Sequence, residues 1–213
     1  MRITVFGATG GIGSRIVTEA QTRGHEVTAV VRTPRPPGAL PADVDVRIGD
    51  AARAADVAAL GAGQDLIVSA TRPAPGAEDQ LPVMARALLA GAAASGVRLL
   101  LVGGSSTLTL PDSGGVAVMD GPDFPAAWLP IARACAVQLA ACRAADPDTD
   151  WAYASPPHLI LPGARTGAYR LGGDELVVDG EGESAISMED FAVALLDEAE
   201  RPKHHRTRFT VAY

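Results

Sequence analysis

The sequence is short of the residues on which disulfide-bonded, metal-binding and membrane-spanning proteins depend. Its 213 residues include two cysteines, and no apolar run is long enough to cross a bilayer. Cys135 and Cys142 fall on one predicted helix, where a rise of about 1.5 Å per residue separates them by roughly 10 Å. That is too far for a disulfide, so we expect both in the core. The four histidines lack metal-ligand spacing, and we expect no metal.

Positive charge is also scarce. The net charge of −7 at pH 7 argues against nucleic acid or an anionic membrane surface as a partner. The 47% hydrophobic content excludes a disordered chain. The length suits one α/β domain with a small annex. No secretion signal is recognisable, and we expect a cytoplasmic protein.

The opening segment predicts a strand, a tight turn and a helix. Residues 2–6 are mostly apolar, and residues 14–23 have a helical pattern. In this context the first glycine permits a sharp turn, the second lets backbone approach a pyrophosphate, and the third lets the helix pack on the strand. The helix then directs its free N–H groups at the phosphates. A glycine-rich hairpin is the alternative. The predicted dinucleotide-binding residues are Gly7, Ala8, Thr9, Gly10, Gly11, Ile12 and Gly13.

The remaining chain alternates predicted strands and helices, which indicates a Rossmann-type, doubly wound and mostly parallel sheet. We expect a single domain over residues 1–213, with residues 155–190 forming a small C-terminal lobe on the substrate side. The irregular stretch 108–126 is long enough to be a functional or mobile loop that could cover a substrate. Strands are predicted at 25–31, 44–48, 65–70, 97–102, 150–154, 176–178 and 208–212, and helices at 51–60, 79–95, 128–144 and 191–200.

The end of the second predicted strand favours NADP over NAD. An NAD site places an acid there for the ribose 2′-hydroxyl, whereas an arginine accommodates a 2′-phosphate. No acid lies between Glu26 and Asp43, and Arg32 stands at the strand end with Arg35 close behind. We predict that NADPH is preferred over NADH. The alternative is that Arg32 is only a solvated loop charge.

The glycine spacing resembles that of short-chain dehydrogenases, yet the catalytic Tyr-x-x-x-Lys pair of most members is missing. In that pair, lysine lowers the tyrosine pKa so that the phenol can protonate an alkoxide. The single lysine, Lys203, has Ala199 four residues before it. A flavin or quinone accepts hydride into a delocalised ring whose anion can take its proton from water, so positioning alone can supply most of the rate. We therefore predict reduction of such a conjugated acceptor.

Further segments resemble the biliverdin-IXβ reductase/NADPH-flavin reductase group, an NmrA-like, atypical branch of the short-chain dehydrogenases. They are residues 155–159 (Ser-Pro-Pro-His-Leu) and 166–169 (Thr-Gly-Ala-Tyr), together with the glycine motif. Residues 120–125 and 169–174 resemble bacterial NADH-flavin reductases of the same branch. The resemblance covers nearly the whole chain.

The resemblance implies roles for residues that follow the predicted strands. The family's serine after the fifth strand, which faces the nicotinamide and substrate, matches Ser105 or Ser106. Serine is also an ordinary turn residue. His158 would orient the acceptor or relay a proton near the nicotinamide, which its ordinary pKa near 6.5 suits, unless it merely caps a loop. For Asp50, the alternative to a cofactor contact is a role as the N-cap of the following helix. Further implied cofactor contacts are Asp50, Ala51, Ala70, Thr71, Pro156 and Pro157.

The predicted function is therefore an NADPH-dependent reductase of a small-molecule acceptor, with any flavin acting as substrate rather than as bound cofactor. Two alternatives remain open: a redox-silent, NADP-sensing regulator of the NmrA type, and a tailoring reductase specific to one pathway. We expect no nucleic-acid or membrane partner, and a monomer or small homo-oligomer.

Overall fold

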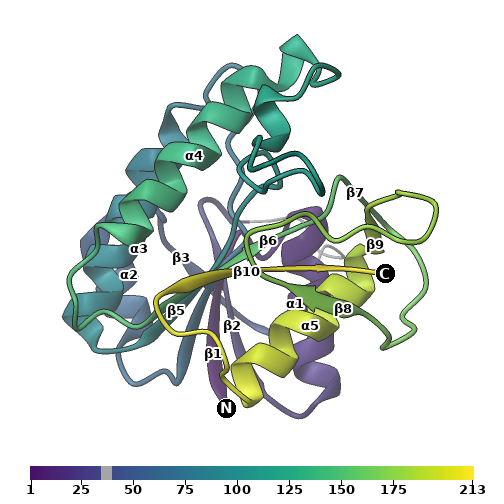
Figure 1. Ribbon diagram of the computed structural model, residues 1–213. Coiled ribbons are helices and arrows are strands. Elements are labelled where there is room, and N and C mark those ends of the chain that lie inside the picture. The colour runs from purple at the N-terminus through teal and green to yellow at the C-terminus, as the bar shows by residue number, and fades with distance from the viewer. Residues whose placement is uncertain (35–39) are drawn as a thin grey trace.

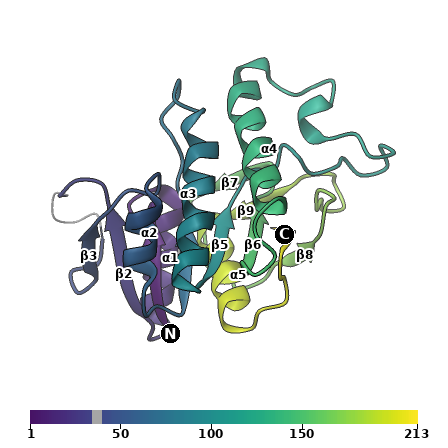
Figure 2. The same cartoon turned by 90° about the vertical axis from the view of Figure 1, so that its left-hand side faces the viewer.

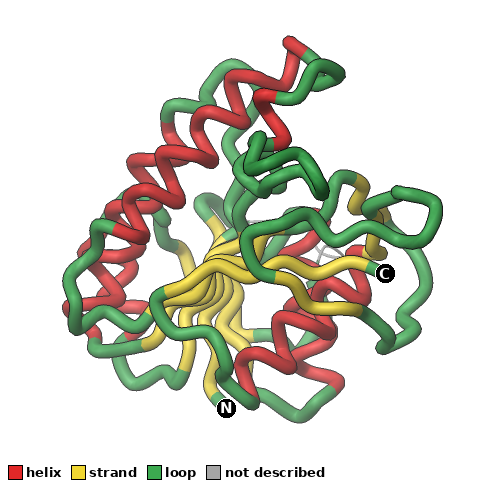
Figure 3. The backbone as a smooth tube through the Cα atoms, viewed as in Figure 1, coloured by secondary structure: helices red, strands yellow, loops and turns green. Residues whose placement is uncertain are grey.

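The computed structural model describes residues 1–34 and 40–213, and within them a mostly parallel sheet lies between two groups of helices (Figures 1 and 3). Eight strands are arranged in the order β3-β2-β1-β4-β5-β6-β10-β8, and only β8 runs antiparallel to its neighbour. This confirms the predicted Rossmann-type fold. The strands are β1 Arg2–Phe6, β2 Glu26–Val31, β3 Asp45–Ile48, β4 Leu66–Ser69, β5 Arg98–Val102, β6 Trp151–Ser155, β8 Arg170–Gly172 and β10 Thr207–Ala212.

The helices cover both faces of the sheet (Figure 1). One face carries α1 (Gly11–Thr22) and α5 (Met188–Glu200). The other carries α2 (Ala54–Gly61), α3 (Gln80–Ser95) and α4 (Leu129–Arg143). Two short strands outside the main sheet, β7 (Leu159–Leu161) and β9 (Ala185–Ser187), pair with each other. Single 3-10 turns occupy Val118–Asp120 and Ala126–Trp128.

Successive side chains along each strand point to opposite faces of the sheet, and this divides the core into two layers. In β1, Ile3 and Val5 pack toward α1 and α5, whereas Phe6 joins the cluster under α2 and α3. In β5, Leu100 packs on the first side and Leu99 on the second, which explains its uninterrupted apolar sequence. Fully burying a side chain of this size contributes about 1.5–3 kcal/mol. The two layers therefore hold every central strand from both faces.

The order of strands creates a crevice at one end of the sheet. The chain moves outward from β1 through β2 to β3 and then returns to β4 on the other side of β1. In such sheets ligands bind outside the carboxyl ends of the strands, at the point where the order reverses. The ends of β1 and β4 lie side by side there, because Phe6 is in register with Ser69.

Two local predictions were wrong, and three short strands were not predicted. The second helix begins at Ala54 with Arg53 as N-cap, not at residue 51 after Asp50. Asp50 instead accepts a hydrogen bond from the Ala52 amide at 2.9 Å and so forms a turn. Residues 176–178 form no strand, because the Leu176 side chain leaves the sheet for a separate cluster. Strands β7, β8 and β9 were not predicted; they are only three residues long and carry no clear periodicity.

The long connection from β5 to α4 is a packed structure, located beside the N-terminal end of α4 (Figure 2). Leu108 and Val118 form a small hydrophobic cluster with Leu176, a residue from a distant segment. The backbone of Thr109 also bonds to the segment that contains Leu176: its amide donates to the Asp174 carbonyl, and its carbonyl accepts from the Leu176 amide, each at 2.9 Å. The predicted loop is therefore tied into the fold along much of its length.

No helix in residues 1–34 or 40–213 combines the length and the apolar character that crossing a membrane requires.

Candidate functional site

The glycine turn after β1 is shaped by backbone contacts that leave no room for side chains. Gly7 has φ +77°, a conformation that favours glycine, and a β-carbon there would lie 2.5 Å from the Ala70 carbonyl oxygen. A β-carbon on Gly13 would lie 2.0 Å from the Gly7 carbonyl oxygen. The first glycine thus brings β1 against the end of β4, and the third brings α1 against the turn.

The start of α1 is suited to bind a phosphate group. Its N-cap is Gly10, which provides no capping side chain, and its first turn contains no acidic residue. The first amides of a helix have no partner within the helix and carry its positive dipole end. Gly10 and Gly11 are exposed, so backbone can be approached closely there. By contrast, α5 is capped by Ser187, whose hydroxyl accepts from the Asp190 amide at 2.9 Å. These residues fit a dinucleotide pyrophosphate.

The neighbouring strand ends bring other predicted residues to the same edge. Ala70 and Thr71 follow β4 directly and are half-buried, and the Ser69 and Thr71 hydroxyl oxygens lie 3.0 Å apart. Asp50 and Ala51 follow β3, where Ala51 is buried and Asp50 is half-buried. The glycine turn and the ends of β3 and β4 therefore line a continuous edge of the sheet.

Two arginines at this edge make no ion pair or hydrogen bond with any described residue. Arg32 is exposed directly after β2, as predicted, while Arg35 lies outside the described residues. Arg72 is exposed after β4, and sequence reasoning did not select it. The sequence did contain a signal for Arg72, because this arginine stands three residues beyond a strand whose apolar sequence indicates burial. Most other arginines of the described chain are paired with carboxylates or carbonyls.

The turn after β5 separates the two candidate serines. Ser106 is 6% exposed, and its hydroxyl donates to the Ala132 carbonyl of α4 at 3.3 Å. Ser105 is half-exposed, and its hydroxyl has no hydrogen-bond partner among the described residues. Ala132, which contacts this turn through its carbonyl, has an apolar side chain without a proton to donate.

Side chains beneath the turn determine its path. A β-carbon on Gly103 would lie 1.9–2.2 Å from the Tyr153 ring, and one on Gly104 would lie 2.9 Å from Cys135 Sγ. Tyr153 donates to Gln138 Oε1 at 2.9 Å, and burial raises the pKa of its phenol well above the ordinary value. Burial likewise raises the pKa of Cys135 to about 11, while the positive charge of Arg72 acts against that rise. Tyr153 and Cys135 are thus packing residues.

The segment after β6 turns sharply out of the sheet. Ser155, Pro156 and Pro157 are buried, whereas His158 is exposed at the start of β7. Partial removal of its imidazole from water lowers the pKa of His158 below its ordinary value, and the charge of Glu183 opposes this. The imidazole is therefore neutral at pH 7. The two prolines present His158 at the same edge as the turn after β5, since β5 and β6 are parallel neighbours.

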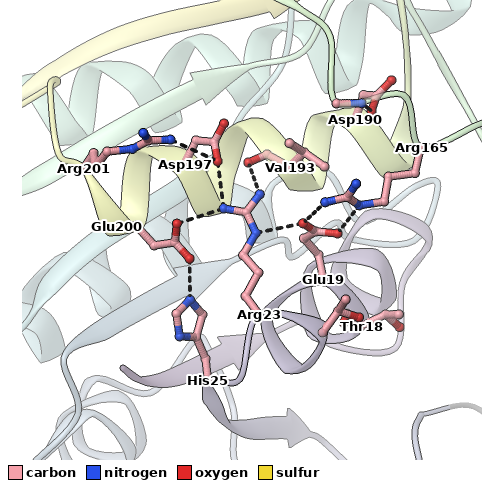
Figure 4. A network of polar contacts seen from close by, with 12 residues as sticks. Thr18, Glu19, Arg23, His25, Arg165, Asp190, Val193, Asp197, Glu200 and Arg201 are labelled. Carbon is pink, nitrogen blue, oxygen red and sulfur yellow. Dashed lines mark hydrogen bonds and ion pairs between the residues drawn. The ribbon is translucent and has the colours of Figure 1, made fainter.

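A network of charged groups holds residues 163–169 against α1 and α5 (Figure 4). Glu19 on α1 accepts two hydrogen bonds from Arg165, at 2.7 and 2.8 Å, and one from Arg23 at 2.8 Å. Asp190 on α5 is fully buried and accepts from the Thr166 amide at 2.8 Å and hydroxyl at 2.6 Å. The segment beyond β7 is therefore fixed to the two helices whose N-terminal ends flank the glycine turn.

Comparisons with known proteins agree with this geometry. The family model described as NAD(P)H-binding matches residues 7–202. The uncharacterised Bacillus subtilis protein YwnB is 38% identical over 217 residues, which covers 99% of this chain and 98% of YwnB.

Solved structures show the same relationship over the full chain. A Burkholderia pseudomallei protein, provisionally named as exported, is 39% identical with a TM-score of 0.89, and the match covers 100% of both chains. A Streptococcus pneumoniae protein, provisionally named an NADH-flavin reductase, is 30% identical with a TM-score of 0.85, covering 100% of this chain and 99% of that one. These matches confirm the resemblance inferred from the sequence motifs, and the chain belongs to the NAD(P)H-binding family.

Proposed function

We propose that this protein is an NADPH-dependent reductase that passes hydride to a flavin, a quinone or a similar conjugated acceptor. The main support is the turn after β5, where the Ser105 hydroxyl has no hydrogen-bond partner among the described residues and the neighbouring helix α4 carries neither tyrosine nor lysine. The bound NADPH supplies the hydride, and the reduced acceptor takes its proton from water. Such an acceptor needs orientation more than acid catalysis. The NADH-flavin reductase name of the S. pneumoniae relative agrees with this reaction.

The residues of this chain have separate roles in the proposed reaction. Backbone amides at the start of α1 hold the pyrophosphate, and Ala70 and Thr71 line the path of the cofactor, with Asp50 and Ala51 at its adenine end. Ser105 donates a hydrogen bond to the acceptor. His158, neutral at pH 7, accepts from or donates to the same acceptor. Pro156 and Pro157 contact the nicotinamide side. Flavin, where it binds, is a substrate.

We also propose that Arg32 selects NADPH. Its guanidinium is exposed after β2 without a partner in the described residues, which leaves it available for a 2′-phosphate. Arg32→Ala should weaken NADPH binding about tenfold while changing NADH binding little, since one charge-assisted contact contributes roughly 1.5 kcal/mol. Arg47→Ala is a matched control, because Arg47 is also exposed but pairs with Asp45 at 3.0 Å. Titration by nucleotide fluorescence measures both. Equal losses for NADPH and NADH would contradict the assignment.

The activity itself is tested by NADPH oxidation with FMN, riboflavin, simple quinones and simple ketones. We expect turnover with flavins or quinones and little with ketones. Ser105→Ala should lower kcat several-fold, whereas Ser106→Ala should mainly lower thermal stability, because the buried Ser106 hydroxyl bonds to the Ala132 carbonyl of α4. Tight NADPH binding without turnover of any acceptor would contradict the reductase and favour a redox-silent sensor. Turnover of ketones alone would contradict the acceptor class.

We propose a cytoplasmic protein, monomeric or a small homo-oligomer, acting on a small molecule without nucleic-acid or membrane partners. The net charge of −7 supports the last point.

A further inference from the structure

We propose that Arg208 is a positioning residue that holds the turn Gly103–Thr107 through the Thr107 hydroxyl and so sets the position of Ser105 Oγ. This inference rests on the proposed function, because the position of Ser105 matters for a reaction only if an acceptor is reduced there.

Arg208 is a buried arginine in the interior of the sheet. It lies on β10, and its side chain is 4% exposed. One terminal nitrogen, Nη1, donates to Thr107 Oγ1 at 2.8 Å. Nε donates to Asp174 Oδ1 at 2.8 Å, and Nη2 pairs with the same carboxylate and donates to the Asp174 carbonyl at 3.3 Å. A single guanidinium therefore joins β10 to two segments that lie 101 and 34 residues away.

Stability alone is a poor explanation for this arrangement. Burying a guanidinium costs several kcal/mol in desolvation, and an apolar residue in its place is often neutral or stabilising. Its partner Asp174 is 67% exposed on the side chain, so the ion pair is screened by water and contributes little. What an apolar residue cannot do is bind the Thr107 hydroxyl and the Asp174 carboxylate in fixed directions.

The residues on both sides of Ser105 in this turn contact groups outside the turn. Gly103 rests on the Tyr153 ring, and Gly104 rests on Cys135. Beyond the serine, the Ser106 hydroxyl bonds to α4 and the Thr107 hydroxyl bonds to Arg208. Two backbone bonds close the turn: the Leu108 amide donates to Ser105 O, and the Met119 amide donates to Ser106 O, both at 2.9 Å.

These contacts place the free hydroxyl in the middle of a rigid frame. A group that orients a reacting molecule must be held by neighbours whose own positions are fixed. Tyr153 and Arg208 are in register on adjacent strands, so β6 and β10 together support the two ends of the turn. Arg208 supplies the support on the C-terminal side of Ser105.

A first test measures the turn without relying on turnover. Thr107→Val removes the hydroxyl that Arg208 binds while preserving the shape of the side chain. We expect amide hydrogen exchange at Leu108 to become about tenfold faster, because the local opening loses one buried hydrogen bond. Thr107→Ser keeps the hydroxyl and should restore slow exchange. Arg208→Lys should act like Thr107→Val, since an ammonium cannot bind two partners in the fork geometry.

Arg206 is the matched control. It lies two residues earlier on the same chain segment, and its guanidinium also holds a loop, donating to the carbonyls of Asp146 at 2.6 Å and Thr149 at 2.9 Å. That loop is at the opposite edge of the sheet. Arg206→Lys should therefore speed exchange of the Thr149 amide and leave the Leu108 amide unchanged.

A second test links the turn to Ser105 by a double-mutant cycle. In the full-length protein with saturating NADPH, Thr107→Val should lower kcat for the flavin or quinone about tenfold, because small misplacements of an orienting group are costly. It should change NADPH affinity less than twofold. In a Ser105→Ala background the same substitution should lower kcat less than twofold further, since its effect passes through the missing hydroxyl.

The outcomes separate this inference from the proposed function. Unchanged Leu108 exchange in Thr107→Val would overturn it, and so would equal loosening of Leu108 by Arg206→Lys. Independent, multiplicative losses of kcat for Thr107→Val and Ser105→Ala would overturn the link to Ser105. Wild-type protein that reduces no acceptor would contradict the reductase instead, and the exchange data would still decide whether Arg208 holds the turn.

Discussion

Two turns at the carboxyl edge of the sheet are both built on glycine, but they are held by different means. In the turn after β1, the groups that exclude side chains are backbone atoms of Gly7 and Ala70. In the turn after β5, they are the Tyr153 ring and the Cys135 side chain. The first turn carries most of its geometry in a seven-residue motif, and the backbone of Ala70 closes its other side. The second takes its geometry from residues 26 to 101 positions away.

The difference matches the role that we propose for each turn. A phosphate is bound by backbone amides, so the first turn needs close approach and a free helix end, and a short motif suffices. The second turn presents one side chain, Ser105, whose direction depends on the neighbours that fix the backbone around it. We therefore expect a substitution in the first turn to be hard to compensate. A substitution in the second turn should be compensated by a second substitution at a residue distant in sequence.

The largest effect is expected at Gly13. Gly13→Ala would place a β-carbon 2.0 Å from the Gly7 carbonyl oxygen, and backbone cannot yield as a side chain does. We expect a loss of about 3 kcal/mol or more in the free energy of unfolding and no measurable NADPH binding. Gly10→Ala is the control for the fold, because its β-carbon would lie 3.4 Å from the same oxygen. Thermal melting and nucleotide titration measure both variants, and a stable Gly13→Ala that binds NADPH would contradict the backbone account.

A smaller and reversible effect is expected at Gly103. Gly103→Ala would place a β-carbon about 2 Å from the Tyr153 ring and should cost roughly 1–3 kcal/mol of overpacking. Tyr153→Leu removes the ring atoms concerned, so the double variant should be more stable than the two single losses predict, by at least ~1 kcal/mol. Chemical denaturation of the four proteins gives this coupling. Strictly additive losses would show that Tyr153 does not shape the turn.

The smallest effect concerns His158 and its pH dependence. Burial lowers the pKa of His158, so the neutral imidazole present at pH 7 becomes charged only below the ordinary value near 6.5. If the neutral form serves the reaction, turnover should be constant near neutrality and fall as pH drops through the lowered pKa. Glu183 opposes the shift, so Glu183→Gln should lower the pKa of His158 further. Proton NMR of the imidazole follows this directly.

Two controls accompany this prediction. His158→Ala should lower turnover and abolish the acid limb of the pH profile while leaving NADPH affinity nearly unchanged. An unchanged profile in His158→Ala would make the histidine a structural residue at the start of β7. A raised imidazole pKa in Glu183→Gln would show that the carboxylate acts otherwise than by its charge.

Much of the central fold was predictable because its signals are local. The strand at residues 2–6, the helix that contains residues 14–22 and the buried strand at 98–102 all show periodicity and apolar content within one short window. The start of α5 also carries a local signal, because the Ser187 hydroxyl caps the helix by accepting from the Asp190 amide. A local signal also gave a wrong helix start at Asp50. Its carboxylate could cap a helix, but it instead accepts from the Ala52 amide and closes a turn ahead of the helix.

The small C-terminal elements were less predictable because their contacts are distant. Leu176 resembles a strand residue, but Leu108 and Val118 draw it into a separate cluster. The segment 163–169 has no periodicity, and Glu19 and Asp190 determine its path. Ser105 and Ser106 are identical neighbours in sequence, and the Ala132 carbonyl is what distinguishes them.

The sequence by itself determined the parallel α/β fold, the glycine cradle and the absence of a tyrosine–lysine pair, since each depends on residue type and short spacing. Only the tertiary structure decided which of the two serine hydroxyls bonds to α4 and that Arg208 reaches Thr107. Those outcomes depend on which distant side chains meet once the strands are in register, and no short window of sequence contains both partners of such a contact.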